Sequence, residues 1–424
     1  MTPKQKLQAH SAEFRRELIQ VVEGIHVGVG YGASNATMIE GETGLIIVDT
    51  LESIGAAEEL MADFRQVSDK PVLAIIYTHS HRDHVGGASV FVQEFPEGQP
   101  PVIYARPTET DMLGAPALAA ISVLRAKRQF AIGVPSWVRI NLGLGPGERS
   151  LRGLGAGLTP PTDSITHDRQ TLTIDGVTIE CVAAPGETPD TMVLWLPNHR
   201  LLIGADNYYK SFPNISPIRG SAYRDVALWV KSLETMLSFD ADYLIPGHSR
   251  PLMDAVTIRT VLTDYRDAIQ HVLQATLEGM NAGKTPDELV QTVKLPKYLA
   301  DKPYLQEFYG TVAWSVRSIF IGYLGWFDGN PTNMFRLPPH EEAARLAKLA
   351  GGVDALLAQL ETAVNEGDSQ WGLQLADALL ALDVHTTQAH SYKAQALKAL
   401  AEEQINATAR NYYLTYALEL EADD

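Results

Sequence analysis

The residues best suited to chemistry in this chain are gathered in one short loop. His79, His81, Asp83 and His84 fall within six residues of one another and follow the apolar run at residues 72–77. An apolar run of this length with β-branched residues is typical of a buried strand, so we expect the loop at the strand's carboxyl end, where α/β sheets place ligands. Imidazole and carboxylate side chains suit zinc or a similar divalent ion. The sequence therefore predicts a metal site in this loop.

The number of candidate ligands indicates two metal ions. A catalytic zinc usually takes three ligands from the protein, and this loop alone offers four. We therefore expect His79 and His81 to hold one ion, and Asp83 and His84 to hold a second. Two ions about 3.5–4 Å apart can hold a bridging hydroxide, lower the pKa of its parent water towards neutrality and polarise an ester oxygen. This pattern favours a two-metal hydrolase over a solvated histidine-rich loop.

Three further metal-competent residues follow later in the chain, each at a strand end. Glu187 lies in the turn Pro-Gly-Glu-Thr-Pro between two expected strands. Asp206 follows the apolar run at 201–205, and His248 follows the apolar run at 243–245. A lone residue of this kind is more often a helix cap or part of a turn, but the repeated placement at strand ends favours one shared site.

The elements that must position these residues alternate strands with helices. Residues 4–20 are expected to form an amphipathic helix. A meander of strands follows, and then strands alternate with helices as in βαβ units. The expected elements are strands at 25–29, 35–40 and 45–50, a helix at 52–66, a strand at 71–77, a helix at about 85–95, and strands at 102–105, 171–174, 177–182, 191–196 and 200–205. This alternation predicts an α/β fold.

Two regions break this rhythm. Residues 107–165 include an expected helix at 115–130 and are otherwise rich in glycine and proline, so we interpret them as an active-site lid, with a disordered insertion as the alternative. From residue 253 onward the expected helices are 254–283, 286–293, 304–322, 341–350, 353–366, 369–382, 386–402 and 406–420. These short helices are interpreted as a dimerisation module that helps to close the active site, with a peptide-binding array as the alternative.

Length and composition narrow the class of protein. With 424 residues the chain is long enough for two or three domains, and 45% hydrophobic with 20% charged residues is typical of a soluble globular protein. A formal charge of -17 argues against a nucleic-acid partner and requires local cations to attract any anionic substrate. The single Cys181 excludes an intramolecular disulfide. We find neither a secretory signal nor a membrane span, so the expected location is the cytoplasm.

The loop, the later strand-end acid and the final Gly-His resemble the metallo-β-lactamase superfamily. The resemblance implies an αββα sandwich with the metals at one edge, followed here by an all-α domain. Many members carry a third histidine in the Pro-Gly-x-Thr-Pro turn, whereas this chain has Glu187, which is similar to the zinc-dependent alkylsulfatases, or type III sulfatases. Further matches to that family are Asn214, 219–220, 265–268, 295–296, 308–312 and 324–331. Residues 406–414 look like its helical dimerisation domain.

The resemblance implies an organisation and a set of site residues. The expected domains are a catalytic domain at 1–285, with the lid-like insertion at 107–165, and a dimerisation domain at 286–424, in a homodimer. One zinc ion is expected at His79, His81 and Glu187, and a second at Asp83, His84 and His248, with Asp206 bridging them and Asp83 and Asp206 as the catalytic residues. Asn214 and Arg219 are the expected sulfate clamp, and Arg317 is a weaker candidate because an arginine in an apolar helix often pairs with an acid.

The activity implied is hydrolysis of a small-molecule alkyl sulfate ester to alcohol and sulfate. The alternatives are another two-metal ester hydrolase, acting on phosphoesters or lactones, and a binding protein with a vestigial site. The family usually has Glu where Asp206 stands, and relatives commonly continue into a sterol-carrier-like domain beyond the equivalent of Asp424. Whether water attacks carbon or sulfur is left open.

Overall fold

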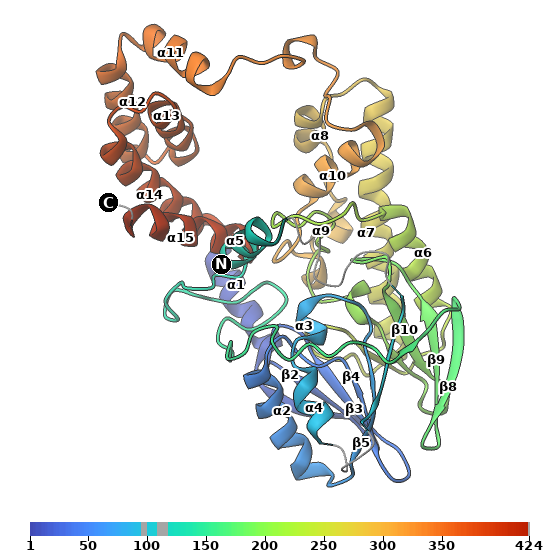
Figure 1. Ribbon diagram of the computed structural model, residues 1–424. Helices are drawn as coiled ribbons and strands as arrows, with labels where there is room; N and C mark the ends of the chain where they lie inside the picture. The colour runs from blue at the N-terminus through green and yellow to red at the C-terminus, as the bar shows by residue number, and fades with distance from the viewer. Residues whose placement is uncertain (95–99, 108–117, 423–424) are drawn as a thin grey trace.

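The computed structural model describes residues 1–94, 100–107 and 118–422 (Figure 1). Two β-sheets packed face to face, with helices on both outer sides, form the first part of the chain, and the remainder is helical. The predicted fold class, an αββα sandwich followed by an all-α domain, is confirmed. Within the described residues, no helix is both long enough and apolar enough to cross a membrane.

The first sheet contains seven strands that follow one another in chain order. The strands are β1 (Glu17–Val22), β2 (Ile25–Val29), β3 (Ala36–Glu40), β4 (Leu45–Val48), β5 (Val72–Ile76), β6 (Val102–Ala105) and β7 (Asp163–Ser164). β1 to β4 pair as an antiparallel meander, and β4 to β7 pair in parallel. β4 and β5 are almost entirely buried because helices cover one face of the sheet and the second sheet covers the other.

The second sheet has five strands in the order β12-β11-β10-β9-β8. The strands are β8 (Arg169–Ile174), β9 (Val177–Ala183), β10 (Met192–Leu196), β11 (Leu201–Ile203) and β12 (Tyr243–Ile245). β8 to β11 are antiparallel, and β12 joins β11 in parallel. Buried side chains from both sheets, among them Val27, Ile46, Ile76, Leu194 and Ile203, fill the layer between them. The carboxyl ends of β5, β11 and β12 therefore reach the same edge of the sandwich.

Helices cover both outer faces of the sandwich. α2 (Ile54–Val67) and α4 (Ala88–Gln93) pack on the first sheet, and α6 (Val226–Leu237) and α7 (Ala255–Asn281) pack on the second (Figure 1). α2 follows the amphipathic pattern predicted for 52–66, and its side chains Leu60 and Phe64 are fully buried against the sheet. Each apolar face is thereby removed from water, which is what stabilises these layers.

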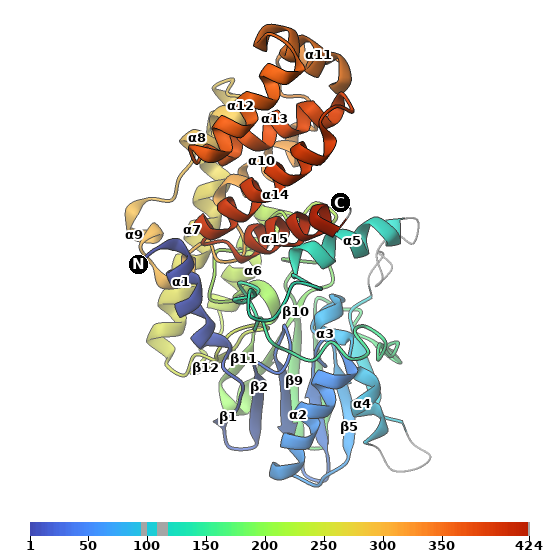
Figure 2. The same cartoon turned by 90° about the vertical axis from the view of Figure 1, so that its left-hand side faces the viewer.

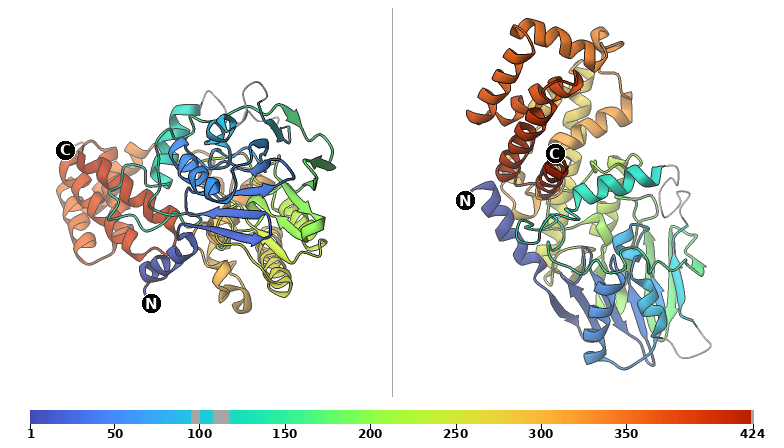
Figure 3. Two further views of the ribbon diagram at one scale, coloured as in Figure 1. Left: turned by 90° about the horizontal axis from the view of Figure 1, so that it is seen from below. Right: turned by 60° about the vertical axis from the view of Figure 1, so that its left-hand side comes forward.

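The helical part begins on the sandwich and then extends away from it. α8 (Pro286–Thr292) and α10 (Val312–Leu324) share one apolar core with α6 and α7, whereas α11 to α14 pack mainly on one another (Figure 3). The remaining helices are α1 (Pro3–His10), α3 (Arg82–Val85), α5 (Ala119–Gln129), α9 (Lys297–Ala300), α11 (Pro339–Ala350), α12 (Val353–Asn365), α13 (Ser369–Ala381), α14 (Thr386–Glu403) and α15 (Ala407–Ala422). α15 lies along α5 of the 107–165 segment (Figure 2).

Two predicted elements differ from the structure. The helix predicted at 4–20 ends early, because residues 17–22 form edge strand β1, which Gly24, with φ of 75°, turns back onto β2. The helix predicted at 304–322 begins only at Val312, and residues 306–311 are not helical. In the described part of 107–165, Leu142 and Leu144 are buried beside Ala33. The segment around Leu142 and Leu144 therefore packs on the sandwich, which argues against a disordered insertion at these residues.

Candidate metal centre and anion site

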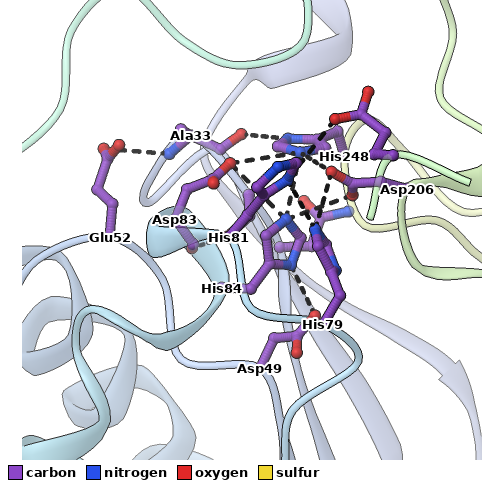
Figure 4. A network of polar contacts seen from close by, with 12 residues as sticks. Ala33, Asp49, Glu52, His79, His81, Asp83, His84, Asp206 and His248 are labelled. Atoms are coloured by element: carbon purple, nitrogen blue, oxygen red, sulfur yellow. Dashed lines mark hydrogen bonds and ion pairs between the residues drawn. The ribbon is translucent and has the colours of Figure 1, made fainter. Parts of the chain in front are cut away.

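The metal-competent side chains meet at one edge of the sandwich (Figure 4). The loop after β5 carries His79 and His81 and leads into α3, which carries Asp83 and His84. From the second sheet, Asp206 follows β11 in a short 3₁₀ turn, Glu187 lies between β9 and β10, and His248 follows β12. Residues 79–84 and these three therefore lie together, as the strand-end pattern predicts.

The first group of ligand atoms comes from His79, His81 and Asp206, whose metal-competent atoms all lie within 4.8 Å of one another. His79 Nε2 is 3.0 Å from His81 Nδ1 and 3.4 Å from Asp206 Oδ2. Glu187 Oε2 adjoins this group, 3.6 Å from His81 Nδ1. Ligand atoms held about 2.0–2.2 Å from a tetrahedral ion stand roughly 3.3–3.6 Å apart. The two spacings that involve a carboxylate fall in this range and the His79–His81 spacing is shorter, so the group is compact enough to hold one divalent ion.

The second group comes from Asp83, His84 and His248. The two Nε2 atoms are 3.4 Å apart, and Asp83 Oδ2 lies 3.7 Å from His84 Nε2 and 3.5 Å from His248 Nε2. The Asp83 side chain is 28% exposed, whereas both imidazoles are buried. The second group therefore opens toward solvent on the side of Asp83.

Asp206 lies between the two groups. Its Oδ2 is 3.4 Å from His79 Nε2 and 3.2 Å from His248 Nε2, and its Oδ1 is 3.3 Å from His84 Nε2. Asp206 Oδ1 is buried without a hydrogen bond, which is costly unless a cation is bound there. A side chain on Gly247 would collide with this oxygen, so glycine is required at that position. The residues therefore fit two divalent ions that share the Asp206 carboxylate.

Three of the histidines are oriented by a second contact on the ring nitrogen that faces away from the group. His84 Nδ1 is 2.7 Å from Asp49 Oδ2, His248 Nδ1 is 2.7 Å from the Ala33 carbonyl oxygen, and His79 Nδ1 is 3.0 Å from Thr78 Oγ1. Because each outer nitrogen donates its proton to an oxygen, Nε2 keeps a lone pair that points into the group. Metal-binding histidines in proteins usually have this arrangement.

The backbone around this edge is held in uncommon conformations. Asp49, Ala205 and Ser249 have φ values of 58°, 48° and 67°, in the left-handed region that non-glycine residues rarely adopt. Each such residue costs of the order of 1–3 kcal/mol, and such residues cluster at functional sites. Asp49 is the hydrogen-bond partner of His84, Ala205 precedes Asp206, and Ser249 follows His248.

The electrostatics of the cluster are those of a cation site. Burial opposes the charged form of His84, but the carboxylates of Asp206, Asp49 and Asp83 raise the pKa of His84 well above its usual value. Burial also opposes ionisation of Asp206, yet the surrounding histidines hold the pKa of Asp206 well below its usual range. The carboxylates thus create a negative potential that bound protons or metal ions can neutralise.

A second set of polar groups lies beside His81, on the side of the expected sulfate clamp. Burial lowers the pKa of His81, and the charges of His79, Arg219 and Arg224 lower it further. Arg224 Nη1 is 2.8 Å from Glu187 Oε2, which is 3.6 Å from His81 Nδ1. Asn214 is buried, and neither atom of its side-chain amide makes a well-formed hydrogen bond. The Arg219 guanidinium donates only to the Gly220 carbonyl oxygen, 3.2 Å away, among the described hydrogen bonds and ion pairs. These donors remain available to an anion.

In the structure, Arg317 is paired with an acid. Its guanidinium on α10 donates to Asp287 Oδ1 at 2.6 Å, and its side chain is 48% exposed. None of the described contacts joins Arg317 to the metal-competent residues. The contact is the simple pairing with an acid that an arginine in an apolar helix often makes, so we leave Arg317 out of the clamp.

Three residues of the site were not among those selected from the sequence. Asp49 orients His84, Tyr209 donates to Glu187 Oε1 at 2.7 Å, and Arg224 donates to Glu187 Oε2 at 2.8 Å. Asp49 follows the buried strand β4, so the same strand-end rule that selects Asp206 could have found it. No local pattern marks Tyr209 or Arg224.

The fold and this pair of adjoining ligand groups define the class of protein. Residues 29–248 match the metallo-beta-lactamase superfamily, and residues 285–423 match the alkyl sulfatase dimerisation family. A linear primary-alkylsulfatase from Pseudomonas sp. (strain ATCC 19151) is 40% identical over 392 residues, covering 91% of this chain and 73% of that protein. The chain therefore belongs to the alkylsulfatase family of the metallo-β-lactamase fold.

Two other relatives extend the comparison. An (R)-specific secondary-alkylsulfatase from Pseudomonas sp. is 32% identical, covering 95% of this chain and 62% of that protein. The solved structure of a double mutant of the sec-alkyl sulfatase PisA1 superposes with a TM-score of 0.89 at 29% identity, covering 99% of this chain and 67% of that one. The chain thus spans between three-fifths and three-quarters of the length of these relatives. Their names and the shared fold support sulfate ester hydrolysis.

Proposed function

We propose that this chain hydrolyses alkyl sulfate esters to an alcohol and sulfate, with two zinc ions held at the edge of the sandwich. The observation that carries the proposal is that Asp206 contacts histidines of both ligand groups, while Tyr209 joins Glu187 of the first group to the Asn214 backbone. Membership of the alkylsulfatase family supports the same reaction.

In this proposal the chain's own residues divide into two tasks. His79, His81 and Glu187 hold one ion, Asp83, His84 and His248 hold the other, and Asp206 is shared. Two such ions lower the pKa of a coordinated water and polarise an ester oxygen. Asp83 Oδ1, which makes no contact among the described hydrogen bonds and ion pairs, can accept a proton from the attacking water. Asp206 holds the two groups at a fixed separation.

The second task is to bind the sulfate group and neutralise its charge. A guanidinium offers two parallel donors that match two sulfate oxygens, and the Asn214 amide adds a further donor. These local cations resolve the conflict between an anionic substrate and a chain with a formal charge of -17. Stabilising negative charge on the sulfate oxygens is the main requirement whether water attacks carbon or sulfur.

Zinc is the proposed metal because the ligands are imidazoles and carboxylates at tetrahedral spacing. The single Cys181 is buried in β9, so it supplies no thiolate to the site. We also propose a homodimer formed by the helical part, a proposal that the match of residues 285–423 to the dimerisation family supports.

A panel assay tests the function. Protein purified without chelator and reconstituted with zinc should contain close to two metals per chain and should cleave alkyl sulfates faster than matched phosphate or carboxylate esters. Faster turnover of a phosphate monoester or lactone would assign the same centre to another two-metal hydrolase. At most a trace of metal after reconstitution would contradict the metal site itself.

A further inference from the structure

The Glu187 carboxylate and the main chain of Asn214 are joined by a closed ring of buried hydrogen bonds. On one side, the Tyr209 hydroxyl donates to Glu187 Oε1 at 2.7 Å and accepts from the Asn214 backbone N–H at 2.7 Å. One phenol oxygen thus contacts both residues. All three residues are at most 5% exposed, so solvent cannot replace these bonds at low cost.

Arg224 closes the ring on the other side. Its Nη1 donates to Glu187 Oε2 at 2.8 Å and to the Asn214 carbonyl oxygen at 2.6 Å. Both oxygens of the Glu187 carboxylate and both polar atoms of the Asn214 peptide units are therefore engaged by the same two side chains. A carboxylate held at both oxygens cannot rotate, and a main chain held at N–H and C=O cannot shift alone.

We propose that Tyr209 and Arg224 are positioning residues that hold the Glu187 carboxylate and the Asn214 main chain in a fixed position relative to each other. This inference rests on the proposed function, in which Glu187 serves the metal group and Asn214 serves the sulfate clamp. Neither side chain need touch metal or sulfate, because each acts through the residue that does. Hydrogen-bond partners of metal ligands typically contribute 10–100-fold to metal affinity or activity.

The distinguishing consequence is that one substitution outside both sites changes both of them. Tyr209→Phe removes a single hydroxyl, leaves Glu187 Oε1 and the Asn214 N–H without their partner, and changes no formal charge. We expect it to speed zinc loss to a colorimetric chelator about tenfold and to raise both the KM for an alkyl sulfate and the inhibition constant of inorganic sulfate several-fold. A residue with only a structural role would lower the thermal midpoint without these two changes.

The matched control is Tyr208→Phe. Tyr208 is also fully buried, its ring lies 5.2 Å from that of Tyr265, and no described hydrogen bond joins its hydroxyl to Glu187 or Asn214. It therefore loses the same group from a neighbouring position. We expect zinc retention, KM and sulfate inhibition like those of the unmodified enzyme.

Arg224→Met supplies a second, independent test in case the tyrosine variant folds poorly. If the arginine only counters negative charge, its removal should strengthen zinc retention by Coulomb attraction alone. Positioning predicts the opposite, namely faster zinc loss together with weaker sulfate inhibition, because Glu187 Oε2 loses its fixed partner. Unchanged or slower zinc loss in this variant would contradict the inference.

The two proposals fail in different ways. If the unmodified protein binds zinc but cleaves no sulfate ester, the proposed function fails, while zinc loss and calorimetric binding of inorganic sulfate still test the link. If the unmodified protein is an active sulfatase and Tyr209→Phe matches Tyr208→Phe in zinc retention and in sulfate inhibition, the function stands and the inference is overturned. A change in only one of the two properties also overturns it.

Discussion

The metal-binding edge of the sandwich and the segment from the end of α10 to Leu337 differ in which groups they expose to water. At the edge, His84 and Asp206 are almost completely buried although both can carry charge. In the segment, Trp326 is 73% exposed and Phe335 is 94% exposed, although both side chains are large and apolar. One region removes charge from water, and the other leaves apolar surface in it.

Both arrangements are unfavourable for an isolated chain, and binding removes the cost in each case. Buried carboxylates and an unpaired Asp206 Oδ1 become favourable when a cation is bound between them. Exposed aromatic side chains become favourable when another surface covers them, and contiguous patches of this kind mark interaction sites. In each region, the groups that the fold leaves without a favourable partner indicate what binds there: buried charges indicate a cation, and exposed aromatic side chains indicate another apolar surface.

The largest expected effect tests the metal-binding edge. Asp206→Asn keeps the shape of the side chain but removes the charge that both groups share. We expect loss of metal from both positions and a fall in kcat/KM of more than about 1000-fold. Metal analysis and alkyl sulfate kinetics measure this, with Asp242→Asn as the control, since Asp242 pairs with Arg200 at the surface. Two retained metals in Asp206→Asn would remove the shared ligand from the proposal.

The next effect separates the anion clamp from the metals. Arg219→Ala should lower kcat/KM by about 30-fold to 1000-fold, or about 2–4 kcal/mol, because a charge-assisted pair to sulfate is lost. Arg219→Lys should recover only part, since a point charge cannot reproduce the planar fork. Zinc content should not change in either variant.

Arg317→Ala measures the contrast between the two arginines. Because the Arg317 guanidinium already pairs with Asp287 and is half exposed, we expect kcat/KM within about twofold of the unmodified enzyme. A loss as large as that of Arg219→Ala would return Arg317 to the clamp.

The sequence predicts the metal edge well because its information is local. Four ligands fall within six residues, and Glu187, Asp206 and His248 each end an apolar strand. The sequence does not indicate which distant side chains orient them. The partners in the Asp49–His84 and Tyr209–Glu187 pairs are 35 and 22 residues apart, and only the fold brings them together.

The boundaries of elements are predicted less well where a turn decides them. Residues 17–22 fit a helical pattern, but the turn at Gly24 lets them pair with β2 and gain sheet hydrogen bonds. Helices α11 to α15 agree with the prediction within two residues, and short breaks such as Gly367-Asp368 separate them in the sequence. At this edge of the sheet, tertiary pairing therefore overrides the local pattern.

The exposed segment gives the fourth prediction. Trp326→Asp together with Phe335→Asp should shift the expected homodimer toward a monomer of 46.4 kDa in light scattering. Aromatic anchors at interfaces contribute about 2 kcal/mol or more each, so the loss of each one should make dissociation roughly 30-fold easier. Leu349→Asp, on α11 and 86% exposed but outside the segment, is the control. A dimer that survives the double variant would place the interface elsewhere.

The last prediction concerns His10, which is buried in the fold. Its ring stacks on Phe308 and its Nε2 is 2.9 Å from the Gly143 carbonyl oxygen, and burial lowers the pKa of His10 to about 4. The pKa of His10 in the folded protein is below its value of about 6.5 in the unfolded chain. Burial of the neutral ring therefore contributes to the free energy of unfolding above pH 6.5, and this contribution is lost as the pH falls toward 4. We expect about 2 kcal/mol of lost stability between pH 7 and 5.

Denaturant titrations at several pH values measure this loss. His10→Gln keeps a donor for the Gly143 carbonyl but cannot titrate, so its stability should depend less steeply on pH over the same range. Equal slopes for the two proteins would assign the acid sensitivity to other groups.

The contact between α5 and α15 affects the order in which the chain can fold. Arg128 of α5 lies 2.6 Å from Glu419 of α15, and the Arg128 guanidinium lies over the Tyr416 ring, 4.5 Å from its centroid. These partners are separated by nearly 300 residues, so the insertion can complete its packing only after the last helix has been synthesised. Contacts of such high sequence separation form slowly, and the sandwich can assemble first. During synthesis, the ligand-bearing strands are thus expected to form a folded centre before α5 is fixed, and the final helix then sets the time at which the packing of α5 is complete.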